Sequence, residues 1–227
     1  MPFFDDSGIV RENHRGLVVG AFAAFAEQVE RMVAVSVAWS VVLFPALVAL
    51  GFPGLPGWLR VSLAMLSSLL VLPATGALFA LAARALAGEQ LDLRAARAAL
   101  RDTWTAALTA LTPLLAGVGL LVWAVVLASA TRLMVLEVLL RGALLGMLVI
   151  SSVWGPLLVA RSNATAGPLL VGSVRLLWLR PAMMVKCCLA AALVLVASVI
   201  TVAGAVLAAP MLIALLQTCL YEEVRHE

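Results

Sequence analysis

Charged residues are missing from most of this sequence. Five stretches contain no Asp, Glu, Lys, Arg or His: Met32 to Leu59, Val61 to Ala83, Thr103 to Thr131, Gly142 to Ala160 and Cys187 to Tyr221. Ionisable side chains inside a membrane span usually mark an ion or proton pathway, so the sequence offers no candidate residues for one. The stretches meet or nearly meet the roughly 20 apolar residues that a helix needs to cross a bilayer core about 30 Å thick.

The overall composition excludes an ordinary soluble domain. Only 12% of the 227 residues are charged, 64% are hydrophobic, and the mean hydropathy is +1.13. Such a chain has too much apolar surface to hide from water, and no segment is left over to form a separate aqueous core. The sequence therefore predicts an all-α, polytopic membrane helix bundle with five transmembrane helices and short amphipathic cytoplasmic helices.

The uncharged stretches define the expected domain organisation. Residues 1–31 are a cytoplasmic amino-terminal segment that is partly an amphipathic helix, 32–221 are a single membrane domain, and 222–227 are an external tail. The expected spans are about 32–50, 61–83, 104–130, 142–160 and 187–209, the last with an extension to 221. We expect Gly204 and Pro210 to break or tilt this final run, with no sixth span; a half-helix entering from outside stays open.

Cysteine and histidine are also scarce. Cys187 and Cys188 are adjacent and Cys219 lies far along the chain, so no disulfide framework is expected. His14 and His226 lie near opposite ends of the sequence, and with these cysteines they make no metal-binding pattern. No carboxylate shows the spacing of a catalytic pair, so the sequence predicts no cofactor and no enzyme; a lipid-modifying enzyme is the least favoured alternative.

Basic residues are nearly all arginine, with fourteen Arg and one Lys. This bias is typical of a GC-rich bacterial genome and predicts a bacterial plasma-membrane protein. Eleven of the fifteen fall on alternate connections that include the amino-terminal segment, so the positive-inside rule predicts a cytoplasmic amino terminus and, after five spans, an external carboxyl terminus. No long basic run exists, so no nucleic-acid partner is expected.

Two cytoplasmic connections are predicted to contain amphipathic helices. In the first, Arg94, Arg97 and Arg101 share one face beside an apolar face that ends at Trp104, and Asp92 is the expected N-cap. Such a helix either lies on an anionic lipid surface or docks on a partner protein, and we favour the lipid surface as the interpretation.

The second connection follows the same pattern. Val174, Leu177 and Trp178 are expected to form the apolar face, with Arg175 opposite and Arg180 closing the helix. This helix too is a candidate for lipid or partner docking.

Small and aromatic residues add two expectations about packing. Gly142 and Gly146 form a GxxxG pair, which predicts close helix packing inside the bundle or, as an alternative, an intermolecular dimer. Trp39 and Trp123 lie deep in their spans and are expected to pack against other helices.

Several short motifs together resemble the YesL-like family of bacterial integral membrane proteins. The strongest are Pro-Ala-Thr-Gly-Ala-Leu at 73–78 and Arg-Ala-Leu-Ala-Gly-Glu at 84–89. Further matches are the Phe3-Phe4 start, Trp39 six residues before Pro45, Arg-Asp-Thr-Trp at 101–104, and Pro-Leu-Leu-Val-Ala-Arg at 156–161. The chain departs from the family by a Gly- and Pro-bearing insert at 51–57.

The resemblance implies a plasma-membrane protein with five or six spans, associated with carbohydrate ABC transport and without catalytic residues. ABC transporter subunits are therefore possible partners, and a non-catalytic accessory or permease-like subunit is the expected function. The Glu-Ala-Ala…Gly pattern of importer permeases is absent at 98–102, which favours an accessory subunit. A scaffold or assembly factor for a membrane complex is the alternative, and the oligomeric state is open.

Overall fold

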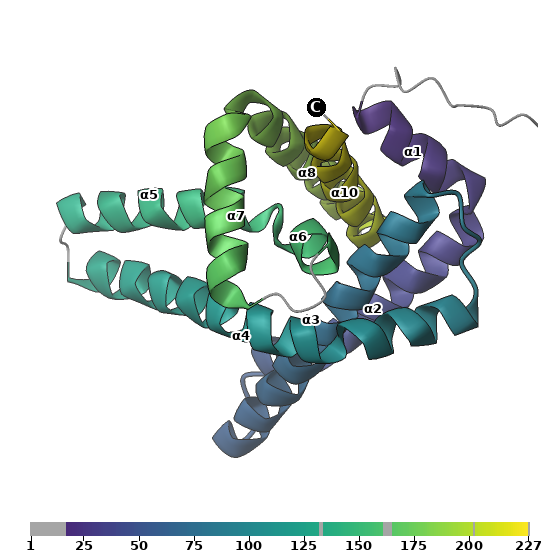
Figure 1. Cartoon of the computed structure of the whole chain (residues 1–227). Coiled ribbons are helices and arrows are strands. Elements are labelled where there is room, and N and C mark those ends of the chain that lie inside the picture. Colours follow the sequence, from purple (N-terminus) through teal and green to yellow (C-terminus); the bar gives the residue numbers. More distant parts are fainter. Residues whose placement is uncertain (1–16, 132–133, 161–164, 202, 227) are drawn as a thin grey trace, which may run out of the picture.

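The computed structural model describes residues 17–131, 134–160, 165–201 and 203–226, and the described elements are all α-helices (Figure 1). They are α1 (Leu17–Glu27), α2 (Val29–Gly51), α3 (Gly57–Leu86), α4 (Leu93–Ala130), α5 (Met134–Ser151), α6 (Trp154–Ala160), α7 (Ala166–Leu179), α8 (Pro181–Thr201), α9 (Ala203–Leu207) and α10 (Ala209–His226). The predicted all-α bundle is confirmed. The Phe3-Phe4 start and Arg161 lie outside the described residues.

Four segments are long and apolar enough to cross a membrane. They are α2, α3, α4 and the segment Met134–Ala160, which combines α5 and α6. A fifth crossing is possible if α7 and α8 act as one span, although the two helices are bent by 106° to each other. The first four expected spans each fall within one of these segments, and the molecule is a multi-pass membrane protein by the length and composition of its helices.

The first two spans form a hairpin. Its turn is the Gly- and Pro-bearing stretch at 51–57, and the guanidinium group of Arg60 donates hydrogen bonds to the carbonyl oxygens of Phe52 and Pro53. Within the hairpin, the Ser67 hydroxyl of α3 donates to the Val42 carbonyl of α2 at 3.0 Å. The stretch at 51–57 therefore forms a closed turn, and α2 pairs with α3 on either side of it.

α3 is the central helix, and its motif at 73–78, together with Phe79, contacts three other helices. Thr75 accepts a hydrogen bond from the indole N–H of Trp39 in α2 at 3.1 Å. A Cβ added at Gly76 would lie 3.1 Å from Thr103 and Ala107, so glycine allows α4 to approach closely. A Cβ at Gly155 would overlap the ring of Phe79, so α6 also sits against α3 only because this position is glycine.

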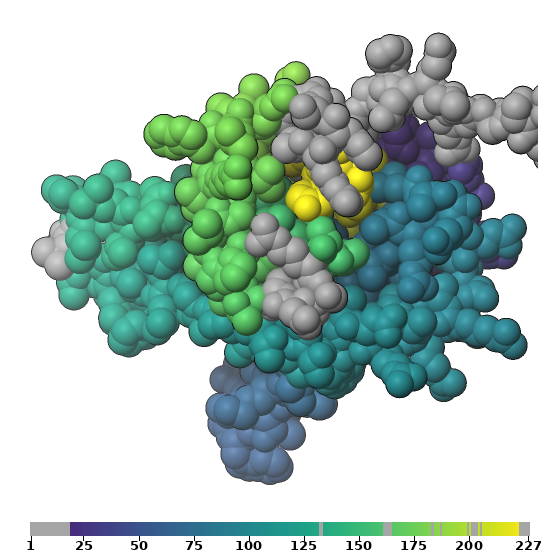
Figure 2. Space-filling view, in the orientation of Figure 1, coloured from purple at the N-terminus to yellow at the C-terminus, as the bar shows by residue number. Residues whose placement is uncertain are grey.

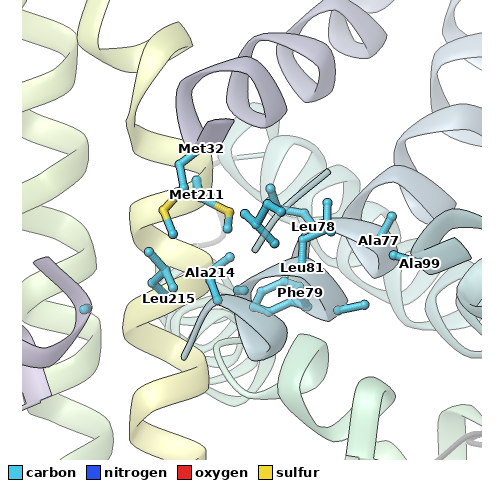
Figure 3. Packing of buried hydrophobic residues seen from close by; sticks show 14 of the residues in the cluster. Met32, Ala77, Leu78, Phe79, Leu81, Ala99, Met211, Ala214 and Leu215 are labelled. Atoms are coloured by element: carbon cyan, nitrogen blue, oxygen red, sulfur yellow. The ribbon is translucent and has the colours of Figure 1, made fainter. Parts of the chain in front are cut away.

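A buried cluster links the two ends of the chain (Figure 3). Met32 at the start of α2 lies next to Met211 in α10, and Leu78 and Leu81 of α3 fill the space beside them. Ala21 of α1 belongs to the same cluster. The amino-terminal helix is therefore part of the packed bundle.

The last uncharged run is divided into three helices. α8 ends at Thr201, α9 covers Ala203–Leu207, and α10 begins at Ala209 with Pro210 in its first turn, a position where proline costs no helical hydrogen bond. The Ser40 hydroxyl of α2 donates to the Val206 carbonyl at 3.3 Å. The predicted break near Gly204 and Pro210 is thus observed, but it is sharper than a tilt.

α10 packs along α8 and also against α1, as Figure 1 shows. Two helices that pack side by side across a link of seven residues, 202–208, must run in opposite directions, because so short a link cannot return the chain to the start of the first helix. α10 therefore leads back toward the side where α8 begins. The expected single span at 187–209 with an extension to 221 did not include this return toward the start of α8.

Two hairpins project from the rest of the molecule (Figures 1 and 2). Their helices carry many exposed large apolar side chains. Leu50, Leu120 and Val135 are among the most exposed, and α5 has no buried residue. Exposing so much apolar surface to water is unfavourable in free energy, whereas contact with lipid tails is not. Trp123 is 62% exposed on this surface, so the expectation that it packs against another helix is wrong. Trp39 does pack, as expected.

Candidate functional site

The turn between α3 and α4 is held by several hydrogen bonds. α3 ends at Leu86, and Gly88 two residues later has a φ of +79°, a left-handed conformation that favours glycine. The N–H of Glu89 donates to the Arg84 carbonyl and the N–H of Gly88 to the Ala85 carbonyl, both at 3.0 Å. These two bonds define a Schellman motif, which fixes the direction in which the chain leaves α3.

The start of α4 is also fixed by a hydrogen bond. The Asp92 carboxylate accepts a hydrogen bond from the Ala95 N–H at 2.6 Å, which confirms the predicted N-cap. Between the two helices, the Gln28 side chain donates to the Glu89 carbonyl and accepts from the Leu91 N–H, each at 2.9 Å. We call residues 84–95 the elbow. Because its backbone groups are bonded at both ends and in the middle, the elbow holds α4 at a fixed angle to α3.

The predicted basic helix is the first part of α4. At 1.5 Å per residue the 38 residues of α4 are about 57 Å long, far more than a bilayer core. Arg94, Arg97 and Arg101 are all exposed, and helical geometry places them opposite the buried face that carries Ala99 and Ala107. We call residues 93–104 the basic arm. It is continuous with the span and is held by the elbow.

An apolar strip runs along one side of the basic arm. Leu93 is 90% exposed, and Leu100 and Trp104 are also exposed. The structure therefore brings the four predicted residues Arg94, Arg97, Arg101 and Trp104 onto one accessible surface. That combination of guanidinium groups and an amphipathic ring suits a membrane interface or a partner with acidic and apolar groups.

The second predicted helix is α7, but its faces differ from the expectation. Leu177 packs toward the core, whereas Val174 and Trp178 point outward with Arg175, and Trp178 is 86% exposed. The predicted separation of an apolar face from Arg175 is therefore wrong. Arg180 follows the last residue of α7 and its side chain is exposed. The two basic surfaces lie on separate helices.

An open cavity of about 380 Å³ lies between the elbow, α4 and α6. Its polar lining comes from Arg84, Glu89, Asp102 and Thr103, and its apolar wall includes Leu158 of α6. Alanines line much of the remainder, which leaves the space open. The Thr103 hydroxyl in this lining donates a hydrogen bond to the Ala99 carbonyl at 2.7 Å.

This grouping is the feature that sequence reasoning missed. Glu89 and Asp102 were expected as separate interfacial carboxylates, Asp102 as an ion pair with Arg101 or a helix-start residue, yet the structure places both in the lining of one cavity with Arg84. Within the described residues, neither carboxylate forms a hydrogen bond or an ion pair, and the Arg84 guanidinium group bonds only the Ala95 carbonyl, at 3.4 Å. The available signal was the turn motif at 84–89, which returns the chain so that α4 faces Arg84.

The predicted glycine pair does not mark a contact inside the bundle. Gly142 and Gly146 of α5 are both exposed, and a Cβ at either would meet no atom within 4 Å. The expectation of close packing within the chain is therefore wrong for this pair, while the alternative of an intermolecular dimer remains a prediction.

Comparison with protein-family models, with curated proteins and with solved structures gives no significant match. The cavity and the basic arm must therefore be interpreted from their own chemistry. Within the described ranges, no three His, Cys, Asp or Glu side chains gather where they could hold a metal ion. The cavity offers charges and hydrogen-bonding groups for binding, and the basic arm offers a surface for docking.

Proposed function

We propose that this chain is a YesL-like, non-catalytic accessory subunit of the bacterial plasma membrane that associates with a carbohydrate transport system through its basic arm. The observation that carries the proposal is the exposed row of Arg94, Arg97 and Arg101 on a helix that the elbow holds rigidly. A surface needed only for orientation could be flexible. A preformed surface loses little conformational entropy on binding, which favours specific association.

Contacts within the motifs support the resemblance. Thr75 and Gly76 of the 73–78 motif contact Trp39 and Thr103, which belong to two of the other matched motifs. Gly88 of the 84–89 motif has the positive φ that the end of α3 requires. Residues from separate motifs therefore contact one another and form one structural unit. These contacts give a structural reason for the motifs to occur together.

For orientation, we propose that both the amino-terminal helix and the end of α10 face the cytoplasm. The excess of arginine supports the first part. The second part rests on the antiparallel pairing of α8 with α10 and on the contact of α10 with α1. The external tail expected for a straight fifth span is therefore not retained.

The test is purification from native membranes in mild detergent, followed by identification of copurifying proteins. We expect ABC transporter subunits with the wild type and their loss when Arg94, Arg97 and Arg101 are replaced by Glu. A triple Arg→Lys variant keeps the charge, and an Arg175→Glu variant changes the other basic surface; both should keep the partners. Equal amounts of each variant in the membrane must be verified.

Two results would contradict the proposal. Unchanged partners in the triple Glu variant would show that the basic arm does not dock and would leave it as a lipid-facing element. Turnover of a lipid by the purified protein, abolished by Asp102→Asn, would instead establish an enzyme.

A further inference from the structure

The cavity beside the elbow has the charges of a site for a ligand that carries both signs. Arg84 supplies one positive group, and Glu89 and Asp102 supply two negative groups. A purely anionic ligand would meet two carboxylates, and a purely cationic ligand would meet a guanidinium group. A zwitterion can place its anionic part at Arg84 and its cationic part between the carboxylates, so each charge meets its opposite.

The position of the cavity favours an amphiphile. Arg84 belongs to the last turn of α3, where the apolar span ends, and Leu158 and Val159 provide an apolar wall on the other side. A lipid headgroup is held at this depth with its acyl chains in the hydrocarbon region. The volume of about 380 Å³ is at the lower end of the range for small-molecule sites.

We propose that this cavity binds the headgroup of a phospholipid that has a phosphate and a primary amine, as in phosphatidylethanolamine. The phosphate accepts hydrogen bonds from the Arg84 guanidinium group, and the ammonium donates to Glu89 and Asp102. A primary ammonium has three N–H donors for these carboxylates, whereas the quaternary ammonium of phosphatidylcholine has none. Phosphatidylglycerol has the phosphate but no cation. The site therefore selects for the amine.

The elbow explains why the site is preformed. Gln28 bonds the backbone carbonyl of Glu89, and the Schellman motif fixes the backbone on either side of it. Asp102 and Thr103 lie on α4, which the Asp92 cap and the elbow hold in place. The carboxylates of Glu89 and Asp102 thus come from two elements whose relative position is set by hydrogen bonds.

The experiment is lipid retention by the full-length protein. The protein is reconstituted in vesicles of equal parts phosphatidylethanolamine, phosphatidylcholine and phosphatidylglycerol, extracted in mild detergent, and the bound lipids are quantified by mass spectrometry. For the wild type we expect retained phosphatidylethanolamine to exceed each of the others by roughly tenfold, the size of effect that charge-assisted hydrogen bonds give. Equal retention of the three lipids would overturn the proposal.

Variants assign the effect to the cavity. The double variant Glu89→Gln, Asp102→Asn should bring the ratio of phosphatidylethanolamine to phosphatidylcholine close to one. Ala83→Leu fills the cavity without changing a charge and should do the same. Ala116→Leu on the exposed part of α4 adds the same side chain outside the cavity; it is the matched control and should keep the wild-type ratio.

Selectivity that survives both cavity variants, or that is lost in the control, would overturn the proposal. Excess soluble phosphoethanolamine distinguishes the source of the ligand. We expect it to leave the lipid in place; displacement would assign the site to a soluble zwitterion and overturn the lipid assignment. The result does not depend on the transport partner, because the double variant keeps Arg94, Arg97 and Arg101 and should still copurify with that partner.

Discussion

The indole N–H of Trp39 donates a hydrogen bond to the hydroxyl oxygen of Thr75 at 3.1 Å, and this bond joins the middle of α2 to the centre of α3. The Thr75 hydroxyl in turn donates to the Val71 carbonyl at 2.7 Å, so its single proton is already used and its oxygen is free to accept. A polar group in an apolar bundle is costly without a partner. The pair therefore fixes the register of α2 against α3.

Replacing Thr75 by Val should reduce stability, because the Trp39 N–H loses its acceptor while the shape of the side chain is kept. We expect a loss of about 1 kcal/mol in the free energy of unfolding. Thr75→Ser retains the hydroxyl and is the control. In a double-mutant cycle with Trp39→Phe, measured by SDS titration in mixed micelles, the two losses should not add. Full additivity would show that the two side chains are not coupled.

Gln28 interrupts the helical path between α1 and α2 and uses its side chain to hold the elbow. Gln28→Leu would leave the Leu91 N–H and the Glu89 carbonyl without their partner. Leu91 is 96% buried, so its N–H cannot readily bond water instead. We expect a loss of about 1–3 kcal/mol in unfolding free energy.

Gln90→Leu is the matched control for this change, because Gln90 is exposed in the same turn and no hydrogen bond of its side chain is described. It should leave the unfolding free energy nearly unchanged. Hydrogen exchange of residues 87–92 should also speed up in Gln28→Leu alone. Equal exchange rates in both variants would mean that Gln28 does not stabilise the elbow.

Gly155 and Phe79 are in contact in a way that leaves no room for a side chain at position 155. Gly155→Ala should destabilise the protein by about 1–3 kcal/mol because α6 must move away from α3. Phe79→Ala removes the ring atoms that would overlap, so the loss in the double variant should be smaller than the sum of the two single losses. Thermal unfolding followed by circular dichroism gives the comparison.

Gly146→Ala is the control for this experiment, since a Cβ there meets nothing within the chain. Its melting temperature should equal that of the wild type. The same variant also tests the remaining interpretation of Gly142 and Gly146. A change in oligomeric state in detergent would support a dimer formed through α5, and no change would count against it.

The long helices could be predicted because their cause is local. An uninterrupted apolar stretch longer than the bilayer core has few structures available other than a helix, and α2, α3 and α4 follow that rule. Asp92 was predicted as an N-cap for the same reason, since its side chain acts on the backbone three residues away. Signals of this kind are contained in a short window of sequence.

The cavity and the path of the last helices could not be predicted because their causes are not local. Glu89 and Asp102 share the cavity only after the elbow reverses the chain, and no sequence pattern gives the angle of that reversal. The return of α10 has no charged residue to mark it, since the run from Cys187 to Tyr221 is uncharged throughout. The expectation for Trp123 was wrong because the depth of a residue in a span does not indicate whether its side chain faces lipid or another helix.

The path of α8 to α10 gives a prediction about where the chain ends. Green fluorescent protein matures in the bacterial cytoplasm but not after Sec export, whereas alkaline phosphatase is active only outside. If α10 returns along α8, a fluorescent protein fused after Glu227 should be fluorescent, and alkaline phosphatase at the same position should be inactive. A fusion after Thr201, at the end of α8, should show the reverse pattern, because the chain has not yet turned back there. The pair of fusions is its own control for expression and insertion.

An active phosphatase after Glu227 would mean that the carboxyl terminus is external, as a straight fifth span requires. It would also mean that the packing of α10 against α8 and α1 does not exist in the membrane.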